Sequence, residues 1–132
     1  MPGDQPILVV DDDDAIRTLI SRVLTRDGHT VEQAANGAEA LDKLRARDCR
    51  VMVLDLMMPV LSGFEVLRYL EEHDDAGTPC VIVASAAASP AVDTAKAVRC
   101  VHAVLRKPFD IDALRQAVNA CLAAADDGQH QQ

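Results

Sequence analysis

Short runs of aliphatic residues alternate along the chain with segments in which apolar residues recur every three or four positions. The first run, residues 7–10, is continuously apolar, which is typical of a strand buried on both faces. Apolar residues then recur at helical spacing from Ile16 to Leu24. Gly28 suits the left-handed turn that ends many helices, so the chain is predicted to begin as a strand and a helix.

The same alternation repeats four more times. The later strands are predicted at residues 30–34, 51–54, 80–84 and 101–105. Each later helix follows a residue whose side chain can cap its first turn, and these residues are Asn36, Ser62, Ser89 and Asp110. Glu39 and Glu65 stand three positions after the first two caps, as in a capping box.

Five strands alternating with five helices predict a doubly wound α/β fold, in which a parallel sheet is covered on both faces. A chain of 132 residues, 49% of them apolar, can bury one core but not two. We therefore expect one domain over residues 6–123, with flexible tails at 1–5 and 124–132. Ligands of such folds bind beyond the carboxyl ends of the strands.

Polar residues follow four of the five predicted strands. Asp11 and Asp12 come after the first strand, Asp55 after the third, Ser85 after the fourth and Lys107 after the fifth. Carboxylates packed together at one edge repel one another, and a bound cation offsets this repulsion. Oxygen ligands at an exposed edge favour Mg²⁺, which retains several waters.

A carboxylate beside a hard metal ion and a lysine can attack a phosphoryl group, because both cations neutralise charge on the phosphoryl oxygens. Asp55 ends the central strand and is the expected nucleophile. Asp11 and Asp12 are adjacent and better placed to hold the metal together. Asp13 and Asp14 are expected to be solvated residues at the start of the first helix, where carboxylates are favourable.

The motifs at residues 7–13, 53–59 and 107–109, with Ser85 after the fourth strand, resemble the CheY-like response-regulator receivers. The resemblance covers roughly residues 6–123 and implies a flavodoxin-like (βα)5 fold with strand order 2-1-3-4-5. It implies that Asp55 takes a phosphoryl group from a phosphohistidine of a sensor histidine kinase or a histidine phosphotransfer protein. The chain would then be a signalling switch that catalyses only its own phosphorylation and slow dephosphorylation, and not a turnover enzyme.

The resemblance also implies the ligands of the ion and of the phosphoryl group. The side chains of Asp12 and Asp55 and the carbonyl of Met57 would bind Mg²⁺, and Asp11 would act largely through a metal-bound water. Lys107 would contact one phosphoryl oxygen, with the peptide bond that follows it in the cis form. The Ser85 hydroxyl would move to bind another oxygen, which would pull the following loop inward.

The chain departs from the family pattern at four positions. Val104 replaces the aromatic residue that often stands three residues before the lysine, and Cys100 replaces the glycine before the fifth strand. The surface of the fourth helix, fifth strand and fifth helix, which would bind a downstream protein, is therefore expected to be unusual. Met57 and Ala87 offer no side-chain hydrogen bond to an attacking water, so slow self-dephosphorylation is expected.

Charge and cysteine content narrow the remaining possibilities. A net charge of -8 disfavours direct binding to nucleic acid, which requires a basic face. No apolar stretch approaches the roughly 20 residues of a membrane helix, and the chain start lacks a signal pattern, so a cytoplasmic protein is expected. Four separated cysteines without a metal-binding motif are expected to be buried thiols of a reducing compartment, at Cys49, Cys80, Cys100 and Cys121.

Two other functions fit parts of the pattern. A phosphatase with an aspartyl-phosphate intermediate usually carries its nucleophile after the first strand and a second acid two residues later, where this chain has Met57 after Asp55. A degenerate receiver would bind proteins without being phosphorylated, but the acidic pair, Ser85 and Lys107 disfavour it. The chain is expected to be a monomer or weak dimer that acts alone, or the receiver part of a longer regulator.

Overall fold

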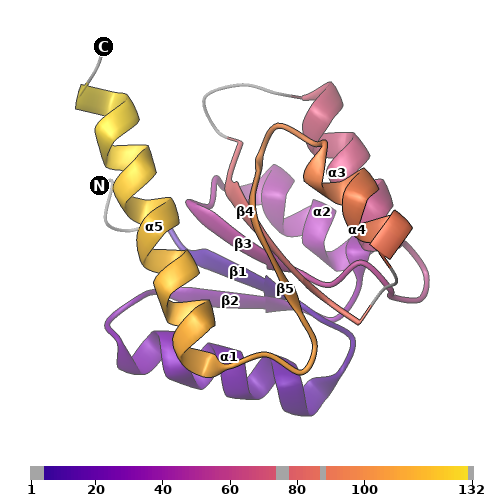
Figure 1. Cartoon of the computed structure of the whole chain (residues 1–132), viewed down its shortest axis with the longest axis horizontal. Coiled ribbons are helices and arrows are strands. Elements are labelled where there is room, and N and C mark those ends of the chain that lie inside the picture. Colours follow the sequence, from indigo (N-terminus) through magenta and orange to yellow (C-terminus); the bar gives the residue numbers. More distant parts are fainter. Residues whose placement is uncertain (1–4, 74–77, 87–88, 131–132) are drawn as a thin grey trace.

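The computed structural model describes residues 5–73, 78–86 and 89–130. Five parallel strands form one sheet in the order β2-β1-β3-β4-β5, which confirms the predicted fold and strand order (Figure 1). The strands are β1 (Ile7–Val10), β2 (Val31–Ala34), β3 (Val51–Leu54), β4 (Cys80–Ser85) and β5 (Val101–Arg106). Because all strands run the same way, their carboxyl ends meet at one edge of the sheet.

The helices cover both faces of the sheet (Figure 1). One face carries α1 (Asp14–Arg26) and α5 (Ile111–His130), and the other carries α2 (Gly37–Ala46), α3 (Gly63–Glu72) and α4 (Ser89–Lys96). The three central strands, β1, β3 and β4, are buried almost throughout, as their continuous apolar sequences predict. The edge strand β5 is only half-buried, so it contributes to the surface between α4 and α5.

Polar side chains fix the starts of the helices as the sequence predicts. The Asp13 carboxylate accepts hydrogen bonds from the backbone N–H groups of Ala15 and Ile16 at the start of α1. Ser62 and Glu65 form the expected capping box at the start of α3. Gly28 follows α1 with a φ of +100°, a conformation that glycine adopts without steric cost.

The last helix is longer than its sequence pattern predicts. We expected residues 124–132 to form a tail, but α5 continues to His130. Alanines at 123–125 favour helix, and a single glycine at 128 lowers helix stability by only about 1 kcal/mol. Although α5 has 20 residues, no helix in the described part of the chain is both long and apolar enough to cross a membrane.

Two of the four cysteines form a disulfide, which corrects the expectation of four buried thiols. Cys80 of β4 and Cys121 of α5 are bonded, with their Cα atoms 5.9 Å apart. Forty-one positions separate them in the sequence, and only the packing of α5 on the sheet brings them together. Cys49 is a buried thiol, and burial raises its pKa to about 12. Cys100 is half-buried and takes no part in the disulfide.

Val60, between β3 and α3, has a φ of 70° and is 82% exposed. This left-handed conformation is costly for a β-branched residue and easier for asparagine. We expect Val60→Asn to raise the free energy of unfolding by about 1 kcal/mol in urea denaturation. Val60→Thr keeps the branched Cβ and is expected to give no gain, so equal stability of the two variants would contradict backbone strain at this position.

Candidate functional site

The residues predicted to lie at the strand ends meet at the carboxyl edge of the sheet. Lys107, after β5, places its Nζ 2.7 Å from Oδ2 of Asp11 and 3.3 Å from Oδ2 of Asp55. Asp11 follows β1 and Asp55 follows β3, so three strands contribute to one ionic cluster. We refer to Asp11, Asp12, Asp55 and Lys107 as the acidic cluster.

The carboxylates of the acidic cluster are close enough to share a cation. One oxygen each from Asp11, Asp12 and Asp55 lies within 4.8 Å of the other two. Asp11 and Asp55 are only 2% and 5% exposed, whereas Asp12 is exposed to solvent. Three hard oxygen donors with one open side fit Mg²⁺, which keeps part of its water shell.

Burial of charge dominates the electrostatics of the cluster. Burial raises the pKa of Asp55, and Asp11 raises it further, against the lowering effects of the Met57 N–H and of Lys107. For Lys107, burial alone would lower the pKa, but the hydrogen bond that its ammonium donates to Asp11 and the charges of Asp55 and Asp11 raise it. The lysine is therefore firmly protonated, and it offsets part of the repulsion between the two aspartates.

Backbone contacts fix the position of Asp55. Its N–H donates to the carbonyl of Val10 at 3.0 Å, and its Oδ1 accepts the N–H of Met57 at 3.2 Å. Gly63, at the start of α3, approaches so closely that a Cβ there would lie 2.3 Å from the carbonyl oxygen of Asp55. Only glycine allows α3 to begin against the loop that carries Asp55.

Arg17 of α1 supports the other side of the cluster, a role that the motifs in the sequence do not predict. Its guanidinium donates to the carbonyl oxygen of Asp11 at 2.8 Å and to the side chain of Gln33 on β2 at 3.1 Å. The same side chain pairs with Asp14, three residues earlier. The only sequence signal for this role is that a basic residue, Arg17, follows the acidic run 11–14 about one helical turn later.

Ser85 and Lys107 are connected through the backbone. The Lys107 N–H donates to the Ser85 carbonyl at 3.0 Å, where β4 and β5 end side by side. The Ser85 side chain is fully buried, and the peptide bond between Lys107 and Pro108 is cis, as expected. The predicted hydroxyl ends β4 and the predicted amine directly follows the neighbouring strand β5, at the same edge of the sheet.

The positions that depart from the family pattern differ in their location and in their exposure to solvent. Met57 is 61% exposed beside the acidic cluster. Val104 is half-buried on β5, and with four residues of α4 and β5 it lines a hollow of about 250 Å³. At the start of β5, the Val101 N–H donates to the carbonyl oxygen of Val98 and closes a turn. Cys100 lies in this turn without a positive φ, so the turn does not need a glycine there. Ala87 lies outside the described residues.

Comparison with known sequences defines the class of protein. A family model described as the response regulator receiver domain matches residues 7–119. Sporulation initiation phosphotransferase F of Bacillus subtilis is 31% identical over 119 residues, covering 90% of this chain and 94% of that protein. Transcriptional regulatory protein AfsQ1 of Streptomyces coelicolor is 46% identical over 68 residues, covering 52% of this chain and 30% of that protein.

Solved structures agree with the sequence relatives. The chemotaxis protein CheY4 of Vibrio cholerae has a TM-score of 0.78 at 30% identity, covering 89% of this chain and 98% of that chain. The response regulator TrrA of Thermotoga maritima, solved with Mg²⁺-BeF, has a TM-score of 0.77 at 29% identity, with the same coverage. This chain belongs to the response regulator receiver domain family.

Two general properties of the family bear on the site. Receiver domains are signalling domains of two-component systems, and they generally bind Mg²⁺ at an acidic pocket. In this chain the acidic cluster brings three carboxylates together at the carboxyl edge of the sheet. The chain spans less than a third of AfsQ1 but nearly all of sporulation initiation phosphotransferase F, so its relatives include proteins of very different length.

The raised pKa of Asp55 predicts that its charge destabilises the metal-free fold. Because the folded pKa exceeds the unfolded one, the ionised carboxylate favours unfolding, and the penalty disappears as pH falls through the folded and then the unfolded pKa. We expect Asp55→Asn to increase the free energy of unfolding at pH 7, in EDTA, by on the order of 1 kcal/mol. The gain should shrink in acid.

Exposed Asp12 provides the matched control, because Asp12→Asn removes a charge that water already solvates. Its effect on the free energy of unfolding in EDTA should be smaller. Millimolar Mg²⁺ should raise the Tm of the wild type and raise that of Asp55→Asn much less, since binding stabilises the folded state by mass action. Lower stability of Asp55→Asn than of wild type in EDTA would contradict the proposed cost of burying this charge.

Proposed function

We propose that Asp55 of this receiver accepts a phosphoryl group from a phosphohistidine of a sensor histidine kinase or a histidine phosphotransfer protein. The observation that carries the proposal is the position of Asp55 in the acidic cluster. Its carboxylate lies 3.3 Å from the Lys107 ammonium and within 4.8 Å of the carboxylates of Asp11 and Asp12. A nucleophile between a cation site and an ammonium suits phosphoryl transfer.

Each residue of the cluster has a proposed role. Asp12, Asp55 and the Met57 carbonyl hold Mg²⁺, and Asp11 supports the ion through one of its waters. When bound, the ion neutralises charge on the phosphoryl oxygens. Lys107 contributes a second positive charge, which its raised pKa keeps in place across the physiological pH range.

In the transfer step, an oxygen of the Asp55 carboxylate forms a bond to phosphorus while the bond from phosphorus to the histidine nitrogen breaks. The imidazole leaves with the electron pair of the broken bond and takes up a proton. Lys107 pairs with a phosphoryl oxygen in place of the Asp55 carboxylate. Little chemistry is required of the protein beyond orientation and charge neutralisation.

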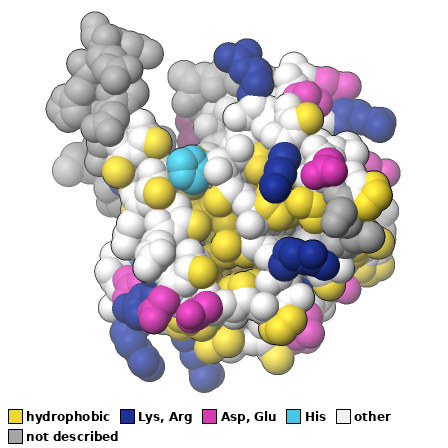
Figure 2. Space-filling view, viewed as in Figure 1, with side chains coloured by type: hydrophobic (Ala, Val, Ile, Leu, Met, Phe, Trp, Pro, Cys, Tyr) yellow, Lys and Arg dark blue, Asp and Glu magenta, His cyan; other side chains and the backbone are white. Residues whose placement is uncertain are grey.

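Ser85 connects the reaction to the surface that binds the downstream protein. Its hydroxyl is proposed to move to a phosphoryl oxygen, which shifts the end of β4 relative to α4. The face formed by α4, β5 and α5 carries apolar side chains along its middle, with Lys and Arg side chains beside them (Figure 2). Such a mixed surface supports docking of a protein partner.

Val104 makes the connection between the two regions unusual. In many receivers an aromatic ring at this position changes its rotamer when the Ser or Thr hydroxyl moves. Val104 has no ring and cannot follow a movement of Ser85 in this way. The hollow of about 250 Å³ beside Val104 leaves space for α4 to move instead. We propose that displacement of α4 conveys the phosphorylated state.

The proposal concerns residues 6–123 as the functional unit, whether the receiver acts alone or within a longer regulator. We place it in the cytoplasm as a monomer or weak dimer, without direct contact to nucleic acid. The net charge of -8 supports the last point, because phosphate backbones attract basic surfaces.

Phosphorylation of the purified chain by acetyl phosphate tests the function. We expect incorporation to require Mg²⁺, to stop at one equivalent and to be abolished in Asp55→Asn. Asp42→Asn is a suitable control, because Asp42 is exposed on α2 and its ion pair is with Arg45, outside the acidic cluster. Continued turnover of acetyl phosphate would favour a phosphatase, and equal incorporation into wild type and Asp55→Asn would overturn the proposal.

The side chain of Met57 predicts a long-lived phosphoryl group. We expect Met57→Asn to speed hydrolysis of the aspartyl phosphate roughly tenfold, because an amide can orient the attacking water. Met57→Leu, of similar size and equally apolar, should decay at the wild-type rate. The measurement is loss of phosphoryl label after removal of the donor, and equal decay in the Asn and Leu variants would contradict this role.

A further inference from the structure

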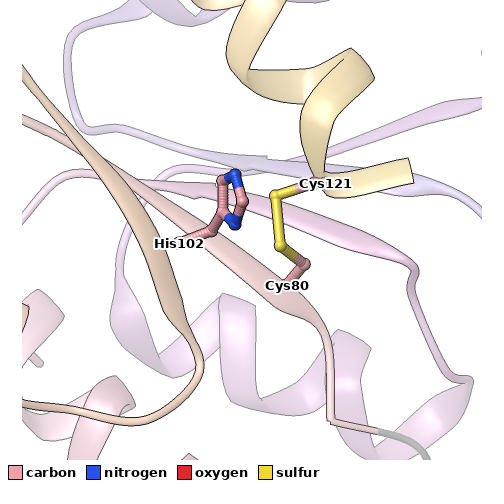
Figure 3. A group of neighbouring side chains, drawn as sticks. All are labelled: Cys80, His102 and Cys121. Carbon is pink, nitrogen blue, oxygen red and sulfur yellow. A yellow bond between two sulfur atoms is a disulfide. The ribbon is translucent and has the colours of Figure 1, made fainter. Parts of the chain in front are cut away.

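Two cysteines and a histidine gather far from the acidic cluster. Cys80 begins β4, His102 lies on β5 and Cys121 lies on the inward face of α5. The two sulfurs and a ring nitrogen of His102 lie within 4.8 Å of one another, and the imidazole stands beside the disulfide (Figure 3). Cys80 and Ser85 are at opposite ends of β4, so this site lies at the amino edge of the sheet, away from Asp55.

An irregularity in β5 places His102 in this group. Val101 is opposite Val81 and Ala103 is opposite Ile82, so His102 is an additional residue in the ladder. Such a bulge changes the direction in which a strand presents its side chains. Val101 and Val104 both pack with the core beneath α2, α3 and α4, whereas a regular strand would direct them to opposite faces.

The group borders open space. A hollow of about 530 Å³ is lined by all three residues and by Arg50, Arg99 and Cys100. Cys121 is fully buried, Cys80 is half-buried and His102 is exposed. A ligand can therefore reach the sulfurs from the side of His102.

We propose that the reduced form of this site binds one Zn²⁺ through the Sγ atoms of Cys80 and Cys121 and a ring nitrogen of His102. A dithiol reductant first donates two electrons and two protons to the disulfide, giving two thiols and an oxidised reductant. Metal binding then releases the two thiol protons. The fourth tetrahedral position faces the hollow and holds a water.

The geometry accommodates this change. Tetrahedral zinc with sulfurs at about 2.3 Å requires the sulfurs to be roughly 3.8 Å apart. The Cα atoms of Cys80 and Cys121 are 5.9 Å apart, so rotation about the side-chain bonds can separate the sulfurs without moving β4 from α5. Two thiolates and a neutral imidazole balance the charge of Zn²⁺, and the arginines that line the hollow favour the thiolate form.

Donor chemistry separates this site from the acidic cluster. Thiolate and imidazole select soft or borderline ions, whereas carboxylate and carbonyl oxygens select Mg²⁺. In reducing compartments, cysteines that approach one another more often serve metal binding or redox chemistry than permanent disulfides. The metal site and the disulfide are therefore alternative states of the same three residues.

Titration of the full chain with Co²⁺, used as a spectroscopic probe for Zn²⁺, tests the proposal. The protein is reduced with a phosphine, and excess Mg²⁺ occupies the acidic cluster. We expect thiolate-to-cobalt charge-transfer absorption that saturates at one equivalent and is lost when Zn²⁺ is added. The oxidised protein should show no such absorption.

Variants assign the ligands. Cys121→Ser should abolish the charge-transfer band of the two-thiolate site, and His102→Ala should weaken Co²⁺ binding by at least about tenfold. Cys100→Ser is the control, since Cys100 borders the hollow but is outside the group, and it should bind like wild type. Because His102 is exposed, His102→Ala should keep the wild-type circular dichroism spectrum.

Absence of charge-transfer absorption in the reduced wild type would overturn the proposal, as would an undiminished band in Cys121→Ser. Binding unchanged in His102→Ala would remove the histidine from the site and also contradict it. The result is independent of the phosphorylation account, because Asp55→Asn should retain the cobalt spectrum. Failure of one proposal therefore leaves the other intact.

Discussion

Two aspartates with almost no exposed surface, Asp11 and Asp55, stand together at the carboxyl edge of the sheet, and the Lys107 ammonium lies between them. Repulsion between buried carboxylates is tolerable only while a cation offsets it. The arrangement needs β1, β3 and β5 to end at the same level, which the parallel register provides. The fold thus holds an energetically unfavourable cluster in place, and in the proposed function this cluster would receive the metal ion and the phosphoryl group.

The same constraint links chemistry to signalling. In the proposed function, a phosphoryl group on Asp55 would change the ionic partner of the Lys107 ammonium, and the Lys107 N–H is bonded to the Ser85 carbonyl on β4. A change at the cluster therefore reaches the strands beside α4 and α5. At the amino edge of the sheet, the bond between Cys80 and Cys121 joins β4 to α5, which is also one of the elements of the proposed partner surface.

Features that depend on local sequence could be predicted. Continuous apolar runs identified the buried strands, the caps at Asp13 and Ser62 marked helix starts, and the order of motifs placed Asp11, Asp55 and Lys107 at one edge. Features that depend on register between distant elements could not. The close approach of Gly63, the Arg17 contact with Asp11, the disulfide and the bulge at His102 all require knowing which residues of separate elements become neighbours.

The most direct test of the central claim is to locate the phosphoryl group itself. Borohydride reduces an aspartyl phosphate to homoserine, and peptide mass spectrometry then identifies the modified residue in protein phosphorylated in the presence of Mg²⁺. If Asp55 is the phosphoacceptor, homoserine is expected at position 55. Homoserine at Asp12 or at any other aspartate, with position 55 unchanged, would contradict it.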